Sequence, residues 1–149
     1  MIASKQLIGL IFSVTVFSLT YGISSPFIAF NLLNAGMSES MIGFNATMHV
    51  VGVFTIAPFL PALFLKFRPV TLIMVSLIAI ATIFILFTIV PLPVWFVLRM
   101  GLGLFSEIIM VQTDTWLNSS TVEQARGKVL ALYTSGMSLG FAAGPLILA

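Results

Sequence analysis

The chain has 149 residues, of which 60% are hydrophobic and 7% are charged, whereas soluble domains carry about 25% charged residues. Six basic and four acidic residues cannot cover a water-exposed surface, so the composition excludes an ordinary soluble domain. The net charge is +2 and the basic residues occur singly or in pairs, which excludes a nucleic-acid-binding patch. The absence of cysteine excludes disulfides and thiolate metal ligands, and no sequence pattern indicates a cofactor.

Five stretches of the chain are apolar and long enough to cross a hydrocarbon core, which takes about 20 helical residues. They predict an all-α, polytopic transmembrane helix bundle over residues 1–149. Although Lys5 precedes the first stretch, that stretch exceeds a signal-peptide core of about 7–15 residues, so we expect a retained span. The expected spans are 6–30, 39–65, 70–90, 94–115 and 129–149.

The segments between the spans indicate where helices end and how the chain is oriented. Ser38 is placed to cap the second helix, and Pro91 and Pro93 break the chain after the third span. Outside the spans, basic residues occur only before the first span and in every second loop, so the positive-inside rule predicts a cytoplasmic N-terminus. These basic residues are Lys5, Lys66, Arg68, Arg126 and Lys128.

The fourth span is the one that contains several charges. A charge at mid-bilayer costs about 2.5–3.5 kcal/mol on insertion scales, so Glu107, near mid-depth, needs a partner, a water path or a proton. Two interpretations are open: Glu107 is a protonatable coupling or substrate group, or it is hydrogen-bonded within the bundle. Asp114 returns to nearly the same helix face, and Arg99 lies about 80° away, so this face should contact protein or a water-filled cavity.

The other two charges of this span lie nearer its ends. Asp114, at the cytoplasmic end, is expected to be structural, as an ion-pair partner of Lys66, Arg68 or Arg126 in one conformation. Arg99 lies about a turn and a half from the outer surface, where it either extends to the interface or binds a ligand.

Polar residues of the first two spans are further candidates. His49, near mid-depth of the second span, either relays a proton or hydrogen-bonds across helices. In the outer half of the first span, Tyr21 and Ser24 precede Pro26, which removes a helix hydrogen bond and predicts a bend. Their hydroxyls either line a cavity or bond the freed carbonyls.

The fifth span contains glycine at every fourth position, at Gly136, Gly140 and Gly144, followed by Pro145. Such a row of small residues lets another helix approach closely, and the proline predicts a bend. The span is still apolar at Ala149, which indicates that the chain is a fragment.

Several of these segments resemble the major facilitator superfamily of transporters. The segment from Gly140 to Pro145 is similar to the G-x-x-x-G-P pattern of the family's fifth helix, particularly in antiporters, and Arg126 to Tyr133 resembles the approach to it. Arg99 to Gly103 is similar to an Arg-and-Gly segment of the fourth helix. Asp114 to Asn118 resembles a poorly characterised bacterial branch. In the loop after the second span, the match is limited to Arg68-Pro69 and basic character.

The resemblance implies a fold of twelve helices in two six-helix halves, with a site between the halves near the midplane. The chain would then be five spans of the N-terminal half, with the C-terminal half of the transporter as its partner. Because the family's first and fourth helices line the cavity, Tyr21, Ser24, Arg99 and Glu107 become candidates for substrate or proton coupling. Gly144-Pro145 becomes a candidate gating bend.

The implied function is secondary active transport of a small solute by alternating access, coupled to protons, in a bacterial plasma membrane. The partners would be membrane lipid, a small-molecule substrate and protons, with no enzymatic activity. The alternative is a complete small membrane protein that acts as an assembly or interaction subunit. An intramembrane enzyme is disfavoured because Glu107 and Asp114 lie about 10.5 Å apart along the helix.

Overall fold

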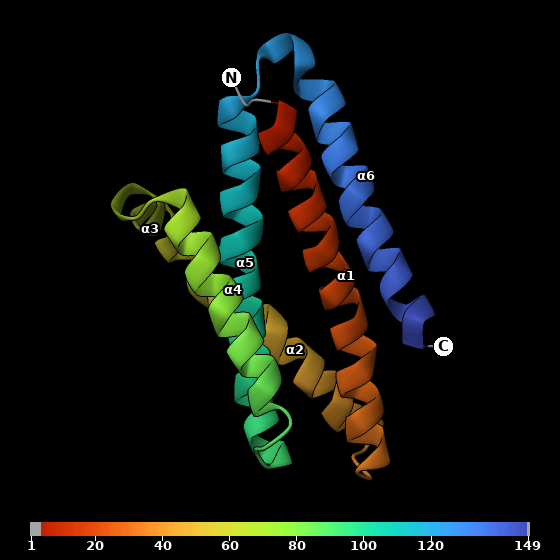
Figure 1. Cartoon of the computed structure of the whole chain (residues 1–149). Coiled ribbons are helices and arrows are strands. Elements are labelled where there is room, and N and C mark those ends of the chain that lie inside the picture. The colour runs from red at the N-terminus through yellow and green to blue at the C-terminus, as the bar shows by residue number, and fades with distance from the viewer. Residues whose placement is uncertain (1–3, 149) are drawn as a thin grey trace. The chain divides into compact units, whose positions relative to one another are not determined.

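The computed structural model describes residues 4–148, and every regular element in that range is helical (Figure 1). Five stretches within this range are long and apolar enough to cross a membrane, which confirms the all-α polytopic bundle. Residues 1–3 and 149 lie outside the described range, and so does the last residue of the expected span 129–149. The elements are α1 (Ser4–Asn34), α2 (Glu39–Ile56), η1 (Ala57–Phe59), α3 (Leu60–Lys66), α4 (Pro69–Leu86), η2 (Leu92–Val94), α5 (Trp95–Ser120) and α6 (Glu123–Leu148).

The chain divides into two compact units. The first comprises α1, α6 and the last residues of α5, and the second comprises Ala35–Thr115. The core of the first unit is built from Val14, Leu117, Val129 and Tyr133, all buried. The core of the second unit is built from Leu60, Leu72 and Ile108.

The second span begins where the sequence predicts and contains a break that we did not predict. Ser38 adopts an extended conformation, and its side chain accepts a hydrogen bond from the Met41 amide at 3.4 Å, which confirms it as the helix cap. The span then runs over Glu39–Lys66, interrupted by the 3₁₀ turn η1. Pro58 and Pro61 are the cause, because neither can donate the amide hydrogen bond that continues an α-helix.

Several helix ends differ from the expected span ends. The helix α4 stops at Leu86, and residues up to Val90 form turns with hydrogen bonds from Phe87 to Ile83 and from Thr88 to Ile85. The polar stretch 116–128, expected to separate two spans, is largely helical, since α5 continues to Ser120 and α6 begins at Glu123. Apolarity marks the part of a helix inside the hydrocarbon, whereas polar residues can extend the helix beyond it.

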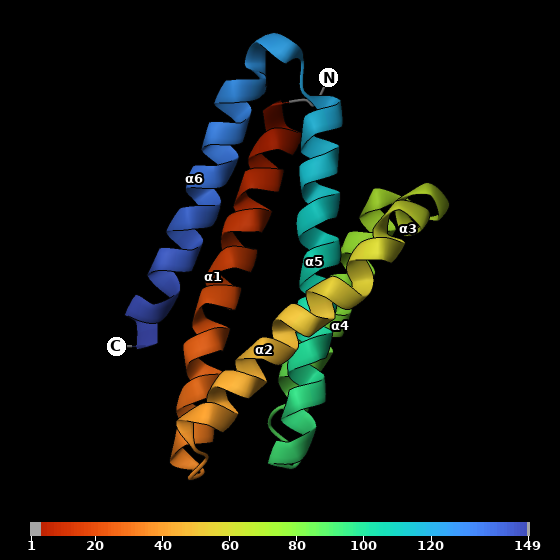
Figure 2. The same cartoon turned by 180° about the vertical axis from the view of Figure 1, so that it is seen from behind.

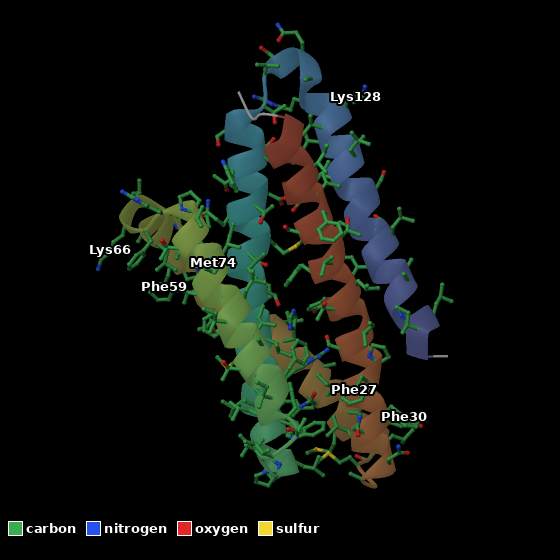
Figure 3. All side chains as sticks on the ribbon, viewed as in Figure 1. Phe27, Phe30, Phe59, Lys66, Met74 and Lys128 are labelled. Atoms are coloured by element: carbon green, nitrogen blue, oxygen red, sulfur yellow. The ribbon has the colours of Figure 1, made fainter. Side chains whose placement is uncertain are left out.

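Large apolar side chains lie on the outside of both units. Phe27 is 49% exposed and Phe30 62% in the first unit, while Phe59 is 59% and Met74 53% exposed in the second (Figure 3). In water such a surface would aggregate, but lipid tails solvate it. The distribution therefore fits helices that face a bilayer.

Candidate functional site

Two glycines bring the backbones of α2 and α5 into direct contact in the second unit. A Cβ atom on Gly52 of α2 would collide with the Met100 carbonyl oxygen and lie 2.9 Å from the Leu104 nitrogen. A Cβ atom on Gly103 of α5 would collide with the His49 carbonyl oxygen and lie 3.1 Å from the His49 Cα. Figure 2 shows α2 crossing α5 in this region. Any larger residue at either position would hold the two helices apart.

This crossing brings together two candidate residues that the sequence places on different spans. His49 lies at the crossing itself and is half-buried. Arg99, one turn before Gly103 in α5, acts on it electrostatically. Arg99 is 3% exposed, so its guanidinium lies inside the protein and does not extend along the outer surface. Between the two interpretations of Arg99, the structure therefore disfavours a purely interfacial position.

The polar face predicted for α5 is graded in exposure. Arg99, Gly103 and Ser106 are buried, Glu107 is half-buried and Asp114 is exposed. Asp114 acts electrostatically on Glu107, as expected from their position on one helix face. Glu107 is thus the carboxylate of this face that lies well inside a candidate span and is partly exposed.

The basic residues expected to pair with Asp114 are all exposed. Lys66 ends α3 with its Nζ 5.6 Å from the centre of the Phe67 ring, and Arg68 follows in the connection to α4. Arg126 lies in the first turn of α6, in the other unit. An ion pair between Asp114 and one of these residues stays a prediction.

Two buried amide side chains were missed by the sequence reasoning. Asn45 of α2 is 1% exposed and Gln112 of α5 is 3% exposed. Within the part of the chain that the structure describes, Asn45 Nδ2 and Gln112 Oε1 have no hydrogen-bond partner. The sequence did carry a signal for both residues, namely an amide side chain inside an apolar span, because such a group is costly to bury without a partner.

The glycine row of α6 packs along α1 in the first unit. A Cβ atom would lie 2.6 Å from Thr15 Oγ1 if placed on Gly136, and 2.8 Å from the Ser18 Cβ if placed on Gly140. On Gly144 it would lie 2.8 Å from the Cα of Gly22. The two helices lie side by side in both views (Figures 1 and 2). The small residues therefore serve the close helix approach that their spacing predicts.

The candidate hydroxyls of α1 lie near the end of this contact. The Tyr21 ring meets Phe141 of α6 edge-on, with 5.5 Å between ring centres and 87° between ring planes. Ser24 is 3% exposed and donates a hydrogen bond to the Tyr21 carbonyl at 2.8 Å. The α1 helix continues through Pro26 as far as Asn34. The Ser24 hydroxyl thus bonds within its own helix.

Five long apolar helices, with buried polar side chains in each unit and the buried Arg99 in the second, define an integral multi-pass membrane protein of the α-helical class. The sequence pattern of the Major Facilitator Superfamily matches residues 4–149, and the chain belongs to this family of transporters. The resemblance seen in the sequence is therefore confirmed.

The chain is also similar to YfkF, an uncharacterized MFS-type transporter of Bacillus subtilis (strain 168), with 31% identity over 140 residues. The match covers 93% of this chain and 36% of the relative, so the chain spans little more than a third of that protein's length. No solved structure gives a significant match.

Proposed function

We propose that the protein, as part of an intact transporter, moves a small solute across the membrane by alternating access and couples this movement to protons. The observation that carries the coupling is Glu107, a half-buried carboxylate within a long apolar helix of a family of transporters. Carboxylates in such positions form proton relays in pumps and transporters. The C-terminal half, membrane lipid, the solute and protons are the proposed partners, and the N-terminus is proposed to face the cytoplasm.

Glu107 is proposed to exchange its proton between the two sides as the transporter changes conformation. Its partial exposure supports this role, because proton transfer requires contact with water or substrate. Asp114, seven residues further along the same face, is exposed and lies toward the cytoplasmic end in the proposed orientation. The pair would thus provide one carboxylate inside the membrane and one near its surface.

Arg99 is proposed to form the cationic side of the site, and His49 to relay a proton beside it. A buried guanidinium offers up to five N–H donors in a fixed geometry, which suits a carboxylate or another anion. We propose that, in one conformation of the transporter, the anion bound by Arg99 is the Glu107 carboxylate or the solute. Tyr21 and Ser24 are proposed to line the cavity from α1, and Gly144-Pro145 to act as a gating bend.

The test uses the intact protein in proteoliposomes with an imposed proton gradient and a panel of radiolabelled sugars, amino acids, organic acids and cations. The wild type should accumulate at least one solute above equilibrium. Glu107→Gln should abolish accumulation but retain exchange of internal for external solute, because exchange needs no net proton movement. Glu123→Gln, an exposed carboxylate at the start of α6, is the matched control.

Two outcomes would contradict the proposal at different levels. Unchanged accumulation by Glu107→Gln would remove this residue from proton coupling while leaving transport in place. An intact, folded protein that moves none of the panel with or without a gradient would count against solute transport itself.

A further inference from the structure

Both helices of the first unit contain an internal proline, Pro26 in α1 and Pro145 in α6. A proline nitrogen carries no hydrogen, so the carbonyl four residues earlier loses its helical donor. These carbonyls belong to Gly22 in α1 and to Phe141 in α6. Both helices continue through their prolines. Each helix therefore has one point at which its hydrogen-bond ladder is interrupted.

The two interrupted points lie against each other. A Cβ atom on Gly22 would lie 2.9 Å from the Phe141 oxygen and 3.2 Å from the Phe141 Cα. On the other side, a Cβ atom on Gly144 would lie 2.7 Å from the Ile23 nitrogen. The residue with the freed carbonyl in α1 thus contacts the residue with the freed carbonyl in α6.

Close helix packing alone does not require this coincidence. The same row continues at Gly136 and Gly140, which contact Thr15 and Ser18 of α1. Pro145 lies five residues beyond Gly140 and Pro26 eight residues beyond Ser18, so neither proline removes a helical hydrogen bond to the carbonyls of these four residues. Close contact at Gly136 and Gly140 therefore needs no missing helical hydrogen bond. The positions of Pro26 and Pro145 are a feature that close packing does not explain.

Gly22 also leaves room for the freed oxygen of Phe141. That oxygen lies on the Cβ side of Gly22, so a side chain there would be forced against the backbone of α6. The Phe141 carbonyl has lost its helical donor, and no water replaces that donor in hydrocarbon. The edge-on contact between Tyr21 and Phe141 lies beside it and holds the same two turns together.

We propose that Pro26 and Pro145 form a single shared flexure point, at which α1 and α6 bend together, and that Gly22 is the positioning residue that couples them. The missing hydrogen bonds make bending easy at this level in each helix. Close backbone contact prevents one helix from bending alone, because its backbone would be driven into the other. The inference rests on the proposed alternating access, which requires helix segments to reorient.

The shared flexure point has a consequence for the candidate site. Tyr21 adjoins Gly22, and Ser24 lies within the same turn of α1. Joint bending of α1 and α6 would therefore move both candidate cavity residues in one step. In this way a change in α6 would reach the side of the cavity that α1 is proposed to line.

The test measures amide hydrogen exchange in the intact protein in lipid nanodiscs. Pro26→Ala restores the hydrogen bond to Gly22 and should slow exchange in α1 around this turn by about 2- to 10-fold, the range expected for one hydrogen bond. The same substitution should slow exchange around Phe141 to Pro145 by at least about 2-fold, although α6 is unaltered. Pro145→Ala should have the reciprocal effect on α1.

Two further variants make this test specific. Pro69 lies in the first turn of α4, where the missing amide has no helical acceptor, so Pro69→Ala should leave exchange in α1 and α6 unchanged. Gly22→Ala separates the two backbones, so in that background the effect of Pro26→Ala should stay within α1. If either proline variant fails to fold, the reciprocal variant gives the same readout.

Exchange in α6 that is unchanged in Pro26→Ala, together with exchange in α1 that is unchanged in Pro145→Ala, would overturn the shared flexure point. Solute uptake is measured in parallel on the same preparations. If a proline substitution changes amide exchange in its own helix alone while solute uptake is intact, this inference alone is rejected. If amide exchange changes in both helices but no solute is taken up, the proposed function alone is rejected.

Discussion

Gly103 of α5 packs against the backbone carbonyl of His49 in α2, where a Cβ atom would collide with the carbonyl oxygen. Gly52 makes the reciprocal contact with Met100, so each helix offers its glycine to the backbone of the other. Because neither contact can be relieved by a side-chain rotation, the spacing of the two helices depends on both glycines. This spacing also sets the position of His49 relative to Arg99.

Gly103→Ala should therefore destabilise the protein by about 1–3 kcal/mol, the usual range for overpacking a tight contact. The measurement is the thermal unfolding of the intact protein in detergent. Gly43→Ala is the control, since Gly43 lies in the partner helix α2 with nothing within 4 Å of the added atom. Equal unfolding temperatures for the two variants would contradict the close crossing.

Arg99→Lys should impair transport while the fold is retained. Lysine keeps the charge but lacks the planar guanidinium, so it loses at least one charged hydrogen bond. We expect solute exchange to fall by about 10- to 100-fold, the factor that corresponds to one such bond. Arg126→Lys, on an exposed residue of α6, should leave exchange within experimental error. Wild-type exchange in Arg99→Lys would show that only the charge matters.

Gln112→Leu should raise stability. The side chain of Gln112 is 3% exposed and its Oε1 has no hydrogen-bond partner in residues 4–148, so an apolar group of similar size removes a desolvation penalty. The gain should be about 1 kcal/mol, read as a higher unfolding temperature. Gln124→Leu, on an exposed side chain of α6, serves as the comparison. A lower unfolding temperature for Gln112→Leu would show that the amide has a partner outside the described residues.

The predicted orientation can be tested with single cysteines, because the chain has no native cysteine. Ala35→Cys, in the turn between α1 and α2, should react with a membrane-impermeant maleimide added to intact cells. Gly127→Cys, which lies in open space in α6, should react only after the cells are permeabilised. The reverse pattern of labelling would invert the topology. Labelling of both sites from outside would contradict the three spans that lie between Ala35 and Gly127.

Most of the helical architecture follows from composition, and the reason is the solvent. Hydrocarbon cannot bond to backbone amides, so each apolar stretch of sufficient length must form a helix. Helix ends were predicted less well. The break at Ala57–Phe59 follows from Pro58 and Pro61, whereas the extension of α5 to Ser120 lies outside the apolar region that defines a span.

The candidate site was predicted one helix at a time. Spacing along α5 correctly places Glu107 and Asp114 on one face, because helical periodicity is local. It does not reveal that His49 lies near Arg99, or that Asn45 and Gln112 are buried. These facts depend on how two distant segments pack, and no periodicity within one segment encodes that packing.

Composition and periodicity therefore specify the number of membrane-spanning helices, the polar face of α5 and the glycine row of α6. The folded chain adds the partner of each face: α1 receives the glycines of α6, and α2 receives Gly103. It also shows that the carbonyls freed by Pro26 and Pro145 belong to residues in contact. Local interactions determine which face of a helix is small or polar, whereas the partner of that face is selected by complementary surfaces far apart in the chain.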